Sequence, residues 1–206
     1  DPLWSRGLGD VYKRQSQVRA LDDPERSLIL SRELIASKIA NQRTLLGRNH
    51  PELAPGLLHA IGAQEDAARM AKSAESLRGH EGQAAALYFG AFGGIIRSIQ
   101  GEEFSRNGRK RRPPPDPVNC VLSLVYTILT HECVAALKTA GLEPSIGAFH
   151  TSLPGRPALA LDLLEPFRPL VGDSVAISLF NRGELSPGHF TRTAAGCLLT
   201  DHGRRA

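Results

Sequence analysis

The sequence is poor in aromatic residues, in cysteine and in long apolar runs. Phenylalanine, tryptophan and tyrosine make up 5% of its 206 residues, whereas hydrophobic residues make up 41% and charged residues 22%. The low aromatic content, together with many alanines and leucines, favours helices. The overall balance excludes a disordered chain and indicates a soluble globular protein that is long enough to bury a sizeable core.

The three cysteines, Cys120, Cys133 and Cys197, lie far apart and form no C-x-x-C pair. Their number and spacing exclude a disulfide framework and a zinc knuckle, so we expect a reducing, cytoplasmic location. The longest nearly apolar run, residues 84–96, is shorter than the roughly 20 residues of a membrane span, and it predicts a buried core helix. No basic segment followed by an apolar stretch opens the chain, so we expect neither secretion nor membrane insertion.

Residues 1–15, DPLWSRGLGDVYKRQ, differ from the rest of the chain because they show no useful hydrophobic periodicity. Residues 5–15 resemble a translated sequencing-library adapter. We therefore expect residues 1–15 to be foreign and disordered, and we assign the domain to residues 16–206. The alternative is a natural basic N-terminal arm.

Two dipeptides, Asp23-Pro24 and Asp116-Pro117, combine an N-cap residue with proline at the first helical position. They predict helices that end near residue 49 and at Gly141. Between these helices we expect two more, over residues 55–77 and 81–99, separated at Gly79.

Prolines interrupt the last third of the chain. We expect a helix over residues 158–171 that Pro166 and Pro169 shorten or kink, then a helix over 174–181 and a small hairpin over 190–200. The predicted fold class is all-α, a single multi-helix domain without internal repeats.

A loop expected over residues 101–115 carries the densest basic cluster of a chain with a net charge of +4. The cluster consists of Arg106, Arg109, Lys110, Arg111 and Arg112. Clustered arginines suit bidentate phosphate contacts, but a solvated surface is an equally good interpretation. The charge permits a polyanionic partner without requiring one.

Acidic side chains stand out on the mostly apolar segment 158–171. Asp162 and Glu165, three residues apart, share one helical face, and in a buried helix they would need an arginine or a metal ion. The alternative is a solvated acidic stripe. His150 on its own is typical of a hydrogen-bonded core histidine, and Glu81 near a helix start is favoured by the helix dipole whatever its role.

Several stretches taken together resemble one family. They are LRGHEGQAAALYF (77–89), GRKRRPPPDPVNCVLSLVYTIL (108–129), GLEPSIGAFH (141–150) and GRPALALDLLEPFRPLV (155–171). In this order and spacing they resemble the CRISPR-associated integrase family Cas1, and with further stretches they cover nearly everything after residue 16.

The resemblance implies a helical catalytic domain that holds Mg²⁺ or Mn²⁺ between Glu81, His150 and Glu165, with Asp162 as a supporting acid. It implies an integrase and endonuclease that joins the 3′-OH ends of a foreign DNA fragment to a CRISPR repeat by transesterification. The basic loop would contact DNA phosphates, and Arg156 and Arg168 would flank the metal. Asn119, in DPVN, matches a family position, but a structural hydrogen bond explains it equally well.

The resemblance also implies partners and missing parts. The partners are double-stranded DNA, a small Cas2-type protein and a second copy of the intact protein. The family's N-terminal β domain is expected to be absent, and the chain to be cut at both ends. Two alternatives stay open at this point, a non-catalytic DNA-binding helical scaffold and another all-α metallohydrolase.

Overall fold

The structure, a computed structural model, describes residues 3–50 and 52–205. The α-helices of this part are α1 (Leu3–Asp22), α2 (Pro24–Asn49), α3 (Pro55–Arg69), α4 (Ala74–Phe92), α5 (Ile99–Asn107), α6 (Pro117–Thr139), α7 (Ala158–Leu164) and α8 (Ser174–Asn181). A π-helical segment, η2 (Arg168–Asp173), lies between α7 and α8. A short 3-10 turn, η1 (Gly93–Ile95), precedes α5. A second one, η3 (Pro187–His189), precedes the two strands, β1 (Phe190–Thr193) and β2 (Gly196–Leu199).

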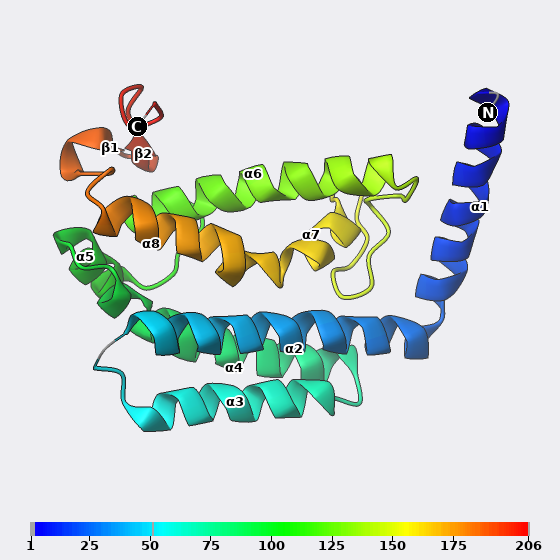
Figure 1. Ribbon diagram of the computed structural model, residues 1–206, viewed down its shortest axis with the longest axis horizontal. Helices are drawn as coiled ribbons and strands as arrows, with labels where there is room; N and C mark the ends of the chain where they lie inside the picture. The colour runs from blue at the N-terminus through cyan, green and yellow to red at the C-terminus, as the bar shows by residue number, and fades with distance from the viewer. Residues whose placement is uncertain (1–2, 51, 206) are drawn as a thin grey trace.

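Two helical layers form the molecule (Figure 1). One consists of α2 packed against α3 and α4, and the other of α6 with α7 and α8. The core between and within the layers includes Ile35 and Ile39 of α2, Tyr88 of α4 and Leu122 of α6, all fully buried. The helical class predicted from the sequence is therefore confirmed.

Both predicted helix starts are confirmed. The Asp23 carboxylate accepts a hydrogen bond from the Glu25 backbone N–H at 2.9 Å, and the Asp116 carboxylate accepts one from the Asn119 backbone N–H at 2.8 Å. A proline fills the first position of each helix, where no intrahelical N–H bond is lost.

The predicted break at Gly79 is wrong. The gap between α3 and α4 falls at residues 70–73, where the Ser73 hydroxyl caps α4 by accepting a bond from the Ser76 N–H at 3.1 Å. Gly79 lies on an exposed part of α4. A glycine there weakens a helix by about 1 kcal/mol but does not end it.

The basic loop is shorter than predicted. Residues 99–107 form α5, which buries Phe104, so the irregular segment covers residues 108–116 and Arg106 lies on a helix. The helix ends at Gly108, whose φ of 66° lies in the left-handed region that glycine adopts easily. Polar side chains dominate α5, and this composition hid the helix among the loop residues.

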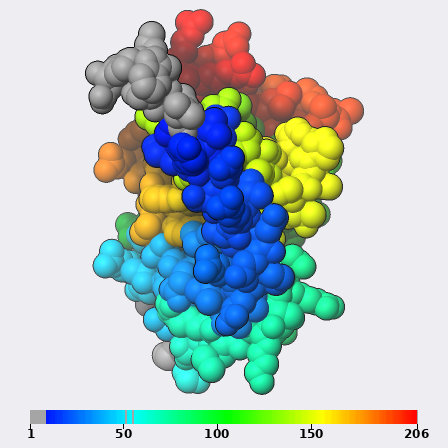
Figure 2. All heavy atoms as spheres, turned by 90° about the vertical axis from the view of Figure 1, so that its right-hand side faces the viewer, coloured from blue at the N-terminus to red at the C-terminus, as the bar shows by residue number. Residues whose placement is uncertain are grey.

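Residues 1–2 of the segment expected to be disordered lie outside the described residues, and residues 3–15 are helical, as part of α1. This helix crosses one face of the molecule beside the end of α6 (Figure 2). Lys13 donates a hydrogen bond from Nζ to the Ala140 carbonyl at 3.0 Å, and Gln17 bonds to the backbone of Glu143. Polar contacts from Lys13 and Gln17 thus help to hold α1, and such contacts leave no hydrophobic periodicity in the sequence. The foreign origin of residues 1–15 stays a prediction.

The later elements follow the expectations. The helix begun at Ala158 stops at Leu164, before Pro166, and the chain continues through η2 into α8. The hairpin is confirmed, with Phe190 paired to Leu199 in antiparallel register. The Cys197 backbone N–H donates to the Pro114 carbonyl at 2.7 Å, so the hairpin holds the base of the basic loop.

The apolar run 84–96 is buried as predicted, with Ala84, Tyr88 and Phe92 at 0% exposure. The α-helix expected over 81–99 ends earlier, at Phe92, and Gly93–Ile95 form the 3-10 turn η1. Among the described residues, one helix, α6, is long and apolar enough to cross a membrane by length and composition. It buries Val118, Val121 and Leu122 within the protein. A core helix of a soluble protein meets the same criterion.

Candidate active site

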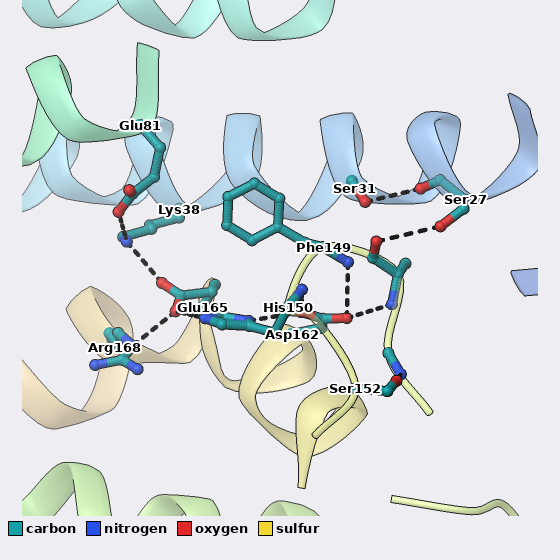
Figure 3. A network of polar contacts seen from close by, with 12 residues as sticks. Ser27, Ser31, Lys38, Glu81, Phe149, His150, Ser152, Asp162, Glu165 and Arg168 are labelled. Carbon is teal, nitrogen blue, oxygen red and sulfur yellow. Dashed lines mark hydrogen bonds and ion pairs between the residues drawn. The ribbon is translucent and has the colours of Figure 1, made fainter. Parts of the chain in front are cut away.

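Two carboxylates, one from each helical layer, meet one lysine (Figure 3). Glu81 points from α4, Glu165 follows the last turn of α7, and Lys38 reaches them from α2. The Lys38 Nζ lies 2.6 Å from Glu165 Oε2 and also forms an ion pair with Glu81. The Lys38 and Glu165 side chains are buried, whereas Glu81 is partly exposed to a cavity.

His150 is held by Asp162. The imidazole Nδ1 lies 2.7 Å from Asp162 Oδ1, and Asp162 is fully buried with two further backbone N–H groups, of Ala148 and Phe149, bonded to Oδ2. A carboxylate accepts hydrogen bonds, so this contact places a ring proton on Nδ1, and in the neutral ring Nε2 then carries the free lone pair. The free Nε2 lies 3.9 Å from Glu165 Oε1.

Close packing at Gly147 sets the position of the loop that carries His150. A Cβ atom at residue 147 would lie 2.7 Å from the Asp162 carboxylate and 2.9 Å from the Ala158 Cβ atom. Both distances are shorter than van der Waals contact. The loop therefore approaches α7 closely enough for Asp162 to bond three consecutive N–H groups because residue 147 has no side chain.

The surroundings of Glu165 keep it ionised. Burial disfavours its charge, but Lys38 and Arg168 outweigh burial and lower the pKa of Glu165 to about 2. The Arg168 Nε lies 3.2 Å from Glu165 Oε1. Burial likewise disfavours the charge on Lys38, but Glu165 and Glu81 raise the pKa of Lys38 above its ordinary value. The site thus contains a buried, fully charged cluster.

The three predicted metal ligands are brought together. Glu81, His150 and Glu165 line one cavity of about 360 Å³, which we call the carboxylate cavity; its other lining residues are Arg78, Arg111, Phe149, Thr151 and Arg156. Within residues 3–50 and 52–205, no three His, Cys, Asp or Glu side chains are grouped tightly enough to hold a metal as they stand. The ammonium of Lys38 lies between the two glutamates instead.

The donor set nevertheless fits a divalent cation. Two carboxylates and an imidazole with a free Nε2 are ligands that Mg²⁺ and Mn²⁺ accept. The hydrogen bond from His150 Nδ1 to Asp162 is the support that metal-binding histidines usually have. Attraction of a cation to this position is visible in the structure, because Lys38 supplies one.

A second cavity, of about 200 Å³, adjoins Arg168. We call it the arginine cavity; it is lined by Arg109, Arg111, Arg112, Arg168, Ser123, Tyr126, Thr127, Thr130 and Leu161. Four guanidinium groups and several hydroxyls around one space, with no carboxylate in the lining, suit an anionic ligand such as a phosphate. Arg111 lines both cavities and Arg156 lines the carboxylate cavity. The remaining predicted DNA-contacting residues, Arg106 and Lys110, are exposed and line neither one.

Asn119 organises the basic loop, so the structural reading of this residue is supported. Its Oδ1 accepts bonds from Arg109 Nη1 at 2.9 Å and from the Lys110 backbone N–H at 2.8 Å. Its Nδ2 donates to the Gly108 carbonyl at 2.9 Å and to the Asp116 carboxylate at 2.8 Å. One fully buried amide thereby fixes the start of the loop against α6.

Sequence reasoning missed Lys38. Its position carried a usable signal, because it follows the buried Ile35 by three residues and precedes the buried Gln42 by four. A lysine on the apolar stripe of a helix needs a buried acid. The resemblance placed Glu81 and Glu165 in the site without indicating their partner.

Sequence reasoning also missed Asp173. This fully buried carboxylate accepts a hydrogen bond from the Tyr88 hydroxyl at 2.7 Å and another from the Tyr126 hydroxyl. Arg168 lies over the Tyr126 ring, 4.6 Å from its centre. Burial raises the pKa of Asp173 to about 6 despite the two hydroxyls that stabilise its charge. Both tyrosines are buried core residues.

Comparison with known proteins gives a family match over nearly the whole chain. The family described as "CRISPR associated protein Cas1" matches residues 2–206. A Cas4/Cas1 fusion from Geobacter sulfurreducens, named as an exonuclease and endonuclease, is 44% identical over 98% of this chain. The alignment covers 37% of that protein, so the chain spans well under half of this relative's length.

Solved structures share the fold. A casposase bound to an integration product superposes with a TM-score of 0.80 at 27% identity, over 93% of this chain and 54% of that one. A partial Cas6-RT-Cas1–Cas2 complex gives a TM-score of 0.83 at 30% identity, over 92% of this chain and 57% of that one. The family match, the relative and the shared fold agree, and the chain belongs to the CRISPR-associated Cas1 family.

Proposed function

We propose that the chain carries the catalytic part of a DNA integrase and endonuclease of CRISPR adaptation, which joins the 3′-OH ends of a foreign DNA fragment to a repeat by transesterification. The observation that carries this proposal is the meeting of Glu81, His150 and Glu165, from three distant segments, at the carboxylate cavity. The adjoining arginine cavity supplies the positive charge that a DNA substrate requires.

The metal ligands in this proposal are Glu81 and Glu165 through their carboxylates and His150 through Nε2. The ion, Mg²⁺ or Mn²⁺, would supply charge stabilisation at a scissile phosphodiester. Asp162 is a positioning residue, because it orients the His150 ring and keeps its proton on Nδ1.

DNA is bound in this proposal mainly through its phosphates. Arg111 lies on both cavities, so a phosphate in the arginine cavity would adjoin a backbone segment beside the carboxylates. Arg156 borders the carboxylate cavity, and Arg168 pairs with Glu165 while facing the arginine cavity. Exposed Arg106 and Lys110 would add contacts outside the cavities. Such binding depends steeply on salt and little on base sequence.

The proposed partners are double-stranded DNA, a Cas2-type protein and a second copy of the intact protein. The solved relatives support the first two, because one is titled as a casposase bound to an integration product and another as a Cas1–Cas2 complex. We propose a cytoplasmic location from the cysteine pattern.

Strand joining tests the proposal. The protein at its natural length is mixed with a short DNA fragment, a repeat-containing target and Mn²⁺, in the wild-type form and as Glu81→Gln, His150→Ala and Glu165→Gln. Each change should lower joining at least about 100-fold, since each removes a ligand. Glu33→Gln, on the exposed end of another ion pair, is the matched control and should join normally. Joining that survives all three site changes would mean that the metal site is assigned wrongly, whereas a wild-type protein that binds DNA but gives no metal-dependent product would favour the non-catalytic scaffold alternative.

A further inference from the structure

The ammonium of Lys38 lies where the proposed metal would be expected. It contacts Oε2 of Glu165 and Oε1 of Glu81, one carboxylate from each helical layer (Figure 3). The lysine side chain is 7% exposed, so water does not screen these contacts. An ammonium ion and a divalent cation compete for the same carboxylate oxygens, and both cannot contact them fully at once.

A buried acceptor lies near Lys38 on the same helix. A small cavity of about 50 Å³ borders Lys38 and Gln42, one helical turn further along α2, and its lining also includes Glu81 and the side chains of Arg109, Arg111 and Arg168. The Gln42 side chain is buried, and within the described residues its Oε1 has no hydrogen-bond partner. Buried acceptors are rarely left without a partner, so this oxygen is a suitable acceptor for a lysine that has left the glutamates.

From these contacts we propose that Lys38 is a displaceable internal cation: it neutralises Glu81 and Glu165 in the metal-free protein and moves aside when a divalent cation binds. The inference rests on the proposed function, because it takes these glutamates as metal ligands. Lys38 is thus a positioning residue that keeps the two carboxylates together before the metal arrives. The contrasting interpretation is a permanent structural ion pair, in which the metal never contacts these oxygens.

If Lys38 is a displaceable cation, removing its charge should lower the stability of the metal-free protein and raise its affinity for a divalent metal. Removing the ammonium leaves two carboxylates close together without a cation, so the metal-free protein should melt at a lower temperature. The same change removes the competitor, so Mn²⁺ should bind more tightly. A permanent structural pair would lose stability without any gain in Mn²⁺ affinity.

The experiment compares Lys38→Met with wild type by titrating Mn²⁺ and following the signal of the free ion by electron paramagnetic resonance. We expect affinity to rise about tenfold, which corresponds to about 1.4 kcal/mol of lost competition. Lys38→Arg keeps the charge and should bind no more tightly than wild type. Arg43→Met, which breaks the α2 pair with Glu65 at 3.3 Å, is the matched control and should leave Mn²⁺ affinity unchanged. Unchanged or weaker binding by Lys38→Met overturns the proposal.

A second measurement uses the wild-type protein, in case Lys38→Met does not fold. The ¹⁵Nζ resonance of Lys38 is followed by NMR during a titration with Mg²⁺, with Lys38→Arg used to assign it. We expect its chemical shift to change in step with Mg²⁺ binding while the resonances of exposed lysines stay in place. A Lys38 resonance that is unmoved at saturating Mg²⁺ overturns the proposal.

Two further variants separate this inference from the proposed function. His150→Ala and Glu165→Gln should lose Mn²⁺ binding if the metal site is assigned correctly. If they lose it while Lys38→Met binds like wild type, the internal-cation proposal fails and the proposed function stands. If both bind Mn²⁺ like wild type, the metal site itself is wrong and both proposals fail.

Discussion

A single oxygen of Asp162 accepts hydrogen bonds from both the ring and the backbone of His150, at 2.7 Å and 2.8 Å. The other oxygen bonds the two preceding backbone N–H groups. One buried carboxylate therefore fixes both the course of the loop and the orientation and tautomer of the imidazole. Neighbouring Glu165, three residues later, is left to face the cavity.

Asp162→Asn should lower the free energy of unfolding by roughly 2–3 kcal/mol, because an amide NH₂ faces backbone donors that the carboxylate had satisfied. Mn²⁺ affinity should fall as well, about 10-fold or more, because the ring loses its support. Urea unfolding and Mn²⁺ titration measure the two effects. Asp66→Asn, on the exposed face of α3, is the control and should change neither. Wild-type Mn²⁺ affinity in folded Asp162→Asn would contradict the positioning role.

Asn119→Ala should disorder the basic loop. It removes four hydrogen bonds that join residues 108–110 and Asp116 to α6. We expect a loss of about 2–3 kcal/mol in unfolding free energy, with weaker DNA binding. Asn181→Ala removes two comparable bonds, to residues 95 and 97, far from the loop. It should cost stability but leave DNA affinity unchanged, and equal DNA affinities for the two variants would contradict the prediction.

Arg111→Gln should weaken DNA binding without reducing stability, because Arg111 is exposed and borders both cavities. The slope of log affinity against log salt concentration is negative, and each lost phosphate contact makes it shallower by about 0.9. Fluorescence anisotropy of a labelled duplex over a range of KCl concentrations measures that slope. Arg26→Gln, exposed at the start of α2, is the control and should keep the wild-type slope. An unchanged slope for Arg111→Gln would remove this arginine from the DNA contact.

Asp173 should make stability depend on pH. Its pKa is raised by burial to about 6, from an ordinary value near 3.8, so the folded state binds the proton more tightly than the unfolded state does. The stability that this difference contributes is fully present below pH 3.8 and is lost as the pH rises to about 6. Linkage predicts that wild type loses about 3 kcal/mol relative to Asp173→Asn over this interval.

Chemical unfolding of wild type and Asp173→Asn at several pH values between 4 and 7 gives this difference directly. Subtracting the two curves cancels the other titrating groups, because both proteins share them. Curves that run parallel would mean that Asp173 has the same pKa in the folded and unfolded states.

Local signals predicted much of the fold. Asp23-Pro24 and Asp116-Pro117 marked two helix starts correctly, because capping depends on neighbouring residues alone. The helix break predicted at Gly79 was wrong because this exposed position in α4 tolerates a weak helix former. The tertiary packing of α4 keeps the helix continuous there. The helical state of residues 3–15 was also missed, because contacts with residues 140–146, far away in sequence, hold α1.

The ligand residues of the candidate site were predictable from the sequence, but the ion pairs and hydrogen bonds around them were not. The resemblance named Glu81, His150 and Glu165, and the structure brings all three to one cavity. Neither the ion pairs of Lys38 nor the bonds from two tyrosines to Asp173 follow from periodicity, because each joins segments that meet only in the folded chain. Identifying such pairs requires a structure. From the sequence alone one could infer only that a buried charge must have a partner somewhere in the fold.

Gly147 has a consequence for genetics. Any side chain at this position would push the loop away from Asp162, so a mutation there should inactivate the protein without touching a ligand or a phosphate-binding group. A random screen for loss of the proposed strand joining should therefore return changes at residue 147 about as readily as changes at His150. Such a screen alone would make Gly147 look like a catalytic residue, although its role is only to leave room for the loop to approach Asp162.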